Sequence, residues 1–97
     1  MNKYEVMFIV KVSDEEAIKS AGKLVQDTIV KNGGTVEKVD EWGRRQLAYE
    51  VKKQTEGYYF VIDFTMKPEN IKELDRVIKI RESIIRHIIL NRMTKQR

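Results

Sequence analysis

Residues 40–51 read Asp40-Glu41-Trp42-Gly43-Arg44-Arg45-Gln46-Leu47-Ala48-Tyr49-Glu50-Val51. Apolar and polar residues alternate over 47–51, which is the period of a half-buried strand. A glycine inside a strand pattern, here Gly43, predicts a β-bulge. On a regular strand Arg44 and Arg45 point to opposite faces, and a bulge can re-aim one of them. Because guanidinium groups match phosphate geometry, this stretch predicts either an anion-binding strand or an edge strand that charge protects from aggregation.

The same kind of pattern continues outward from this strand. Alternating apolar residues predict strands over residues 4–12, 35–51, 57–66 and 84–90, with a connection over 52–56. The first helix begins at a capping box in which Ser13 is the N-cap and Glu16 reaches back to it. It ends at Asn32-Gly33-Gly34, where a left-handed cap suits glycine. The second helix begins at Pro68, whose missing amide is harmless in a first helical turn.

The resulting order is strand, helix, strand, strand, helix, strand. This is the ferredoxin-like split βαβ arrangement, an α+β fold. Right-handed crossovers then predict a four-stranded antiparallel sheet of order 4-1-3-2, with both helices on one face. A length of 97 residues supports one core. We expect residues 1–92 to form a single domain and residues 93–97 to be a short, disordered basic tail.

Composition excludes several classes of protein. Hydrophobic residues make up 41% of the chain and charged residues 35%, as in a globular protein. Without cysteine the chain has no disulfide framework and no thiolate metal site. No apolar run suits a signal peptide or a membrane span, so we expect a cytoplasmic protein. The net charge of +4 equals the charge of the last fifteen residues alone, which contain four basic and no acidic residues and indicate a polyanionic partner.

The residues suited to catalysis are few. His87 is the only histidine, and with Ile85 and Ile89 on the same side of its strand it is predicted to be packed or hydrogen-bonded. Carboxylates lie beside lysines in the predicted helices, which is typical of solvated surface. There is no glycine-rich phosphate loop and no metal-ligand cluster. We therefore predict no enzymatic activity, no cofactor, no metal and no small-molecule substrate.

The face of the sheet away from the helices is predicted to be apolar. If Tyr4, Val6 and Phe8 face the helices, then Met7 and Ile9 face away from them. The same alternation separates Tyr58, Phe60, Ile62 and Phe64 from Tyr59 and Val61, and Ile84, Ile88 and Leu90 from Ile85 and Ile89. Apolar groups from three strands on an uncovered face predict that another protein, or a second copy, docks there.

Two alternative functions fit this pattern. Residues 56–61 partly match the third-strand motif of an RNA-recognition module, with Tyr58 and Phe60 in the stacking positions but Glu56 and Tyr59 out of pattern. A stand-alone RNA-binding module would stack bases on that strand. A ferredoxin-like homodimer that binds a small effector is the other alternative.

Taken together, the chain resembles the bacterial small-subunit ribosomal protein S-six (S6) family. The resemblance covers Lys3 to Arg92 and is most specific over residues 41–49. Glu50 stands where the family usually has proline, and many members have longer tails. The resemblance implies a structural component of the ribosomal small subunit, in the cytoplasm, that binds the central domain of the small-subunit ribosomal RNA and pairs with ribosomal protein S-eighteen.

Two sets of site residues follow. The residues expected to contact RNA phosphates are basic: Lys3, Arg44, Arg45, Arg81, Arg86 and Arg92. The residues expected to contact the partner protein are apolar or aromatic: Trp42, Tyr49, Met7 and Ile9. Because the net charge is modest, we expect RNA binding to require the partner protein.

Overall fold

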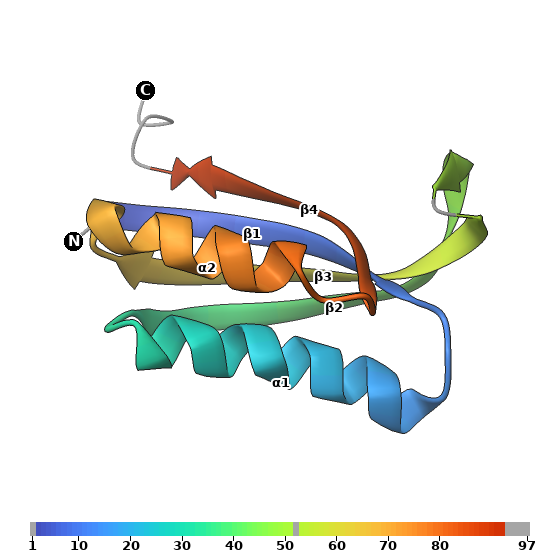
Figure 1. Ribbon diagram of the computed structural model, residues 1–97, viewed down its shortest axis with the longest axis horizontal. Coiled ribbons are helices and arrows are strands. Elements are labelled where there is room, and N and C mark those ends of the chain that lie inside the picture. Colours follow the sequence, from blue (N-terminus) through green and yellow to red (C-terminus); the bar gives the residue numbers. More distant parts are fainter. Residues whose placement is uncertain (1, 52, 93–97) are drawn as a thin grey trace.

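A computed structural model describes residues 2–51 and 53–92 of the chain. The predicted tail at residues 93–97 lies outside the described residues. The elements follow the order β1 (Asn2–Lys11), α1 (Glu15–Lys31), β2 (Thr35–Val51), β3 (Gln54–Met66), a 3-10 turn (Pro68–Asn70), α2 (Ile71–Lys79) and β4 (Ile84–Asn91). The sheet has the order β2-β3-β1-β4 with antiparallel neighbours, and both helices cover one face of it (Figure 1). The predicted ferredoxin-like fold is confirmed.

The ends of α1 were predicted with unequal success. Asp14, not Ser13, is the N-cap, and its Oδ1 accepts a hydrogen bond from the backbone N–H of Ala17 at 2.8 Å. The predicted capping box is wrong because the helix begins one residue later, where the carboxylate also suits the helix dipole. The predicted end is confirmed, since Asn32 is the C-cap and Gly33 has a φ of 83°.

The β2–β3 hairpin is longer than predicted. β3 begins at Gln54 rather than at residue 57, and Val51 pairs with Gln54. Between the Gln46–Glu56 pair and the Val51–Gln54 pair the register shifts, so β2 contributes more residues than β3 to the end of the hairpin. Unequal strands bend a hairpin, and its end curls away from the helices (Figure 1).

The core lies between the sheet and the two helices. Val6 and Phe8 are fully buried, Tyr4 is 6% exposed, and all three belong to the core cluster, as predicted. From α2, Leu74 and Ile78 close the core. This alternation of buried and outward residues along β1 assigns every other residue of the central strands to the uncovered face.

One assignment on β4 is wrong. A register shift between Ile9 and Val10 places Arg86 opposite Ile9 but Ile84 opposite Val10. Ile84 therefore lies in the core and not on the side of Ile88, because a one-residue bulge at Ile85 inverts the alternation beyond it. Ile84 and Ile85 are identical neighbours, so the apolar pattern alone did not show which of them faces the core.

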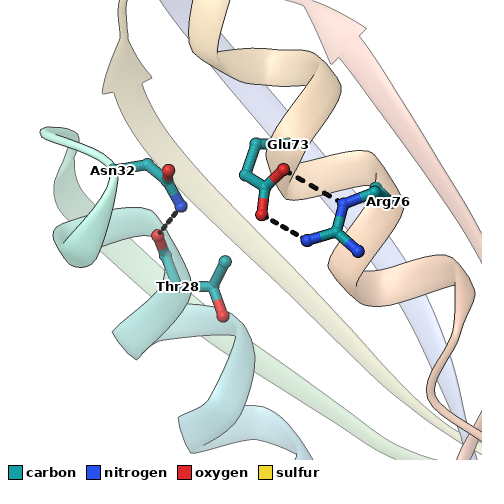
Figure 2. Close-up of polar contacts among 4 residues, drawn as sticks. All are labelled: Thr28, Asn32, Glu73 and Arg76. Carbon is teal, nitrogen blue, oxygen red and sulfur yellow. Dashed lines mark hydrogen bonds and ion pairs between the residues drawn. The ribbon is translucent and has the colours of Figure 1, made fainter.

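Polar contacts fix the helix layer, as Figure 2 shows in part. The Asn32 side-chain amide donates to the backbone oxygen of Thr28 at 2.8 Å, and Arg76 donates to both carboxylate oxygens of Glu73 at 2.6 and 3.1 Å. The Arg76 hydrogen bonds hold the pKa of Glu73 below its usual value. Asn70 donates to the Asn32 backbone oxygen at 2.8 Å and so joins the start of α2 to the end of α1.

His87 connects β4 to the helix layer. Its Nε2 lies 2.6 Å from Oδ1 of Asp75 on α2, and its side chain is 14% exposed. The prediction of a hydrogen-bonded histidine is confirmed. In the part of the chain that the structure describes, neither helix has the length and apolar character that crossing a bilayer requires.

Candidate docking face

The face of the sheet that the helices leave uncovered, here called the open face, is apolar at its centre. Met7 is paired with Val61 on one side and with Ile88 on the other, and Ile9 with Tyr59. Directly paired residues of an antiparallel sheet lie on the same face. Because Val6 and Phe8 point into the core, these five residues lie on the open face.

A groove of about 370 Å³ crosses the open face. Its lining is mainly apolar and comes from all four strands: Met7, Ile9, Leu47, Ala48, Tyr49, Val51, Tyr59, Arg86, His87 and Ile88. The end of the β2–β3 hairpin, over residues 47–51, forms one wall of the groove, and β1, β4 and Tyr59 of β3 form the remainder. The curl of the hairpin therefore makes a concave site out of a sheet face that would otherwise be nearly flat.

A glycine on β3 shapes the floor of the groove. A Cβ atom on Gly57 would lie 2.2 Å from Cγ2 of Ile9, so only glycine leaves room for the Ile9 side chain there. Ile9 is 7% exposed, whereas Ile88 is 47% exposed. Ile9, which was predicted to contact the partner protein, is therefore largely buried and forms part of the floor of the groove.

Gly43 forms the predicted bulge. Its φ is 88°, a conformation that glycine adopts at little cost. Glu41 pairs with Phe60 and Gly43 with Tyr59, so Trp42 is the extra residue of β2. The Trp42 ring stacks on Tyr59 with centroids 6.3 Å apart and an interplanar angle of 8°. The bulge thus places an indole ring over the open face, where it is 47% exposed.

Arg44 and Arg45 lie on opposite faces of the sheet. Arg45 pairs with Gly57 on the open face, and its guanidinium lies 5.4 Å from the centre of the Trp42 ring. Arg44 pairs with Tyr58 on the helix side, where its Nε lies 3.6 Å from a Glu56 oxygen. The bulge precedes both arginines, so it shifts their phase together and does not bring them to one face.

Arg86 and Tyr49 meet across the groove, although 37 residues separate them in sequence. Nη1 of Arg86 donates to the Tyr49 hydroxyl at 3.0 Å, and the guanidinium lies 5.9 Å from the centre of the ring. Tyr49 is 63% exposed. This contact connects the end of the hairpin to β4.

The other predicted cations are dispersed. Lys3, which pairs with Thr65, is exposed at the far end of β1 on the open face. Arg92 forms an ion pair with Glu5. Arg81 follows α2 and lines a cleft between the helices, on the other side of the molecule. The six predicted basic residues therefore do not form one continuous surface.

Tyr58 and Phe60 of β3 do not form an exposed surface on which RNA bases could stack. Phe60 is 2% exposed and stacks on Phe8 inside the core, with centroids 5.0 Å apart. Tyr58 points to the helix side and donates to Glu41 at 3.0 Å. The aromatic residues that do lie on the open face, Trp42, Tyr49 and Tyr59, are out of phase with that motif.

Sequence reasoning missed two features of this face. One is Leu47, which was assigned only to a strand but lies in the groove wall. The other is the pairing of each open-face arginine of the hairpin and β4 with an aromatic ring. Over residues 2–51 and 53–92, no group of three potential ligands could hold a metal ion.

Comparison with known proteins gives a consistent result. The family model described as ribosomal protein S6 matches residues 3–91. The chain belongs to the ribosomal protein S6 family. It is 49% identical over 92 residues to the small ribosomal subunit protein bS6 of Clostridium beijerinckii, with 94% of this chain and 97% of the relative covered. It is 52% identical over 91 residues to the protein of that name from Clostridium perfringens strain SM101, with 93% and 96% covered.

A solved structure agrees with the sequence relatives. The crystal structure of 30S ribosomal protein S6 from Thermotoga maritima superposes with a TM-score of 0.91 at 33% sequence identity, covering 97% of this chain and 90% of that one. The resemblance inferred from sequence is confirmed. As a member of the ribosomal protein S6 family, the chain is a structural protein of the small ribosomal subunit, a cytoplasmic particle, and not an enzyme.

Proposed function

We propose that this chain binds the central domain of the small-subunit ribosomal RNA together with ribosomal protein S-eighteen, and that both partners meet the open face and its rim. One observation carries the proposal: the open face combines an apolar groove with two exposed arginines, Arg86 in the groove lining and Arg45 on the rim. An apolar centre with a basic rim suits a protein partner at the centre and a polyanion at the edge.

The partner protein would occupy the groove. Met7, Tyr49 and Ile88 line it, and Tyr49 and Ile88 remain 63% and 47% exposed in the free chain. Aromatic and aliphatic side chains around a concavity are the usual anchors of a protein interface. Trp42, at 47% exposure, extends the same surface along β2.

The RNA would meet those basic residues named from the sequence that lie on the open face: Lys3, Arg45 and Arg86. Phosphate contacts position a protein on RNA without reading its sequence, and their strength falls with salt. The net charge of +4 over 97 residues is small for such a task. A second protein that adds charge beside the groove would complete the phosphate-binding surface.

Gel-shift titrations of the central-domain RNA, with each protein alone and with both together, test this proposal. We expect tight binding only with both proteins. Ile88→Glu should abolish the cooperative shift, because it places a carboxylate in the groove. Ile80→Glu is the matched control, since Ile80 is 64% exposed on the helix side of the molecule. Tight RNA binding by this chain alone, or equal effects of the two substitutions, would contradict the proposal.

A further inference from the structure

The arginines of this chain differ in the groups that their guanidinium groups contact. We propose that Arg45 and Arg86 are the arginines that contact RNA phosphates. Trp42 and Tyr49 are then positioning residues for these two side chains, and Arg44 makes no RNA contact. The inference rests on the proposed function and divides the basic residues that the sequence could not distinguish.

Arg86 is held but retains its charge. Its Nη1 donates to the uncharged Tyr49 hydroxyl at 3.0 Å, and its guanidinium lies over the Tyr49 ring at 5.9 Å. Arginine has N–H groups on three nitrogens. The Tyr49 contact uses Nη1, and within residues 2–51 and 53–92 Arg86 has no ion pair and no second side-chain hydrogen bond, so the edge formed by Nε and Nη2 remains available. That edge presents two parallel N–H groups, the geometry that binds a phosphate through two hydrogen bonds.

Arg45 is held in a similar way. Its guanidinium lies 5.4 Å from the centre of the Trp42 ring, which is itself stacked on Tyr59 at 6.3 Å. Across residues 2–51 and 53–92, Arg45 forms no ion pair within 4.0 Å. An aromatic face attracts a cation without neutralising it. Arg45 therefore presents a full positive charge from the rim of the open face.

Arg44 and Arg92 are held by carboxylates instead. Nε of Arg44 lies 3.6 Å from a Glu56 oxygen, and Arg92 pairs with Glu5. A phosphate that approached either arginine would meet a negative charge beside it, and repulsion would offset the attraction. Arg44 also lies on the helix side of the sheet, away from the groove. The two adjacent arginines are thus physically distinct, and only Arg45 shares a face with Arg86.

The salt dependence of RNA binding, measured for the complex with the partner protein, tests the assignment. Each phosphate contact adds about 0.7 to 0.9 to the slope of log affinity against log salt. We expect Arg45→Gln and Arg86→Gln each to reduce the slope by about that amount, and Arg44→Gln to leave it unchanged. Arg44→Gln is a matched control because it removes the same charge one residue away. Thermal unfolding establishes that each variant folds.

Double substitutions test the positioning roles. Tyr49→Leu should weaken binding about two- to five-fold, the range of an exposed cation–π contact. Its effect should be smaller in the Arg86→Gln background, because the arginine that Tyr49 positions is already absent and only the contact of Tyr49 with the partner protein is lost. It should keep its full effect in the Arg45→Gln background. Trp42→Leu should show the opposite dependence. A purely structural role for either ring would weaken binding equally in both backgrounds.

The outcomes separate this inference from the proposed function. Equal slope losses for Arg44→Gln and Arg45→Gln would overturn the inference while the complex still binds RNA. Failure of the complex that contains the parent chain, without substitutions, to bind RNA would overturn the proposed function and this inference with it.

Discussion

Replacing Gly43 with alanine tests how the bulge positions the open face. Gly43 has a φ of 88°, and apart from Gly43 itself and its two chain neighbours no heavy atom of the described residues lies within 4 Å of the position that a Cβ would occupy. The substitution therefore introduces no steric clash with neighbours. Any loss of stability comes from the backbone conformation alone.

The expected cost follows from that conformation. A residue with a Cβ costs about 1–2 kcal/mol in the left-handed region. Alanine also reduces the freedom of the unfolded chain, which offsets about 0.4–1 kcal/mol. The net loss is about 1 kcal/mol, which lowers the Tm of a domain of this size by about 4–8 °C. Asparagine tolerates positive φ better than alanine, so Gly43→Asn should cost less.

Urea unfolding and thermal melts measure these differences, and RNA binding with the partner protein reports the functional effect. We expect stability to fall in the order glycine, asparagine, alanine at position 43, with weaker RNA binding for alanine because Trp42 and Arg45 shift together. A Gly43→Ala variant as stable as the parent would refute the reasoning. It would mean that the strand passes this point without a positive φ.

Three further predictions concern stability. Phe64→Ala removes a ring that is 1% exposed in the core and should cost about 3–5 kcal/mol in urea unfolding. The hydrogen bonds of Arg76 lower the pKa of Glu73. The stabilisation they give is therefore present above about pH 4.5 and is lost as the pH falls through the lowered pKa. The urea midpoint of Glu73→Gln should fall below that of the parent at pH 7 and converge with it in acid. The hydrogen bond to Glu41 raises the pKa of Tyr58 above 10.0. The contribution of this hydrogen bond to the free energy of unfolding is therefore lost as the pH rises through the raised pKa. Tyr58→Phe should be less stable than the parent at pH 8, and the difference should shrink in strong alkali.

The fold could be predicted from sequence because its signals are periodic and local. Alternation along β1 and the glycines after α1 each indicate an element or its end without reference to the rest of the chain. The errors lie where a single residue changes the phase. The N-cap moved from Ser13 to Asp14 because adjacent residues can both cap a helix. Ile84 turned into the core because a bulge at Ile85 inverts the alternation.

The candidate site was predicted less completely. Sequence reasoning identified Gly43 as a bulge, which the φ of 88° confirms. It did not reveal that Arg44 and Arg45 have different partners, because these depend on Glu56 across the hairpin and on the ring of Trp42. Nor did it reveal the contact between Tyr49 and Arg86, since that contact requires the hairpin to curl over the sheet. Such long-range contacts follow from tertiary geometry, which periodicity does not specify.

Hydroxyl-radical oxidation of the chain, free and in complex with the RNA and the partner protein, tests the central claim most directly. Trp42, Tyr49 and Ile88 are 47%, 63% and 47% exposed on the open face, whereas Val30 and Ile80 are 60% and 64% exposed on the helix side. We predict that the complex protects the first three side chains and leaves the last two as reactive as in the free chain. Protection of Val30 and Ile80 with undiminished oxidation of Trp42, Tyr49 and Ile88 would contradict the account.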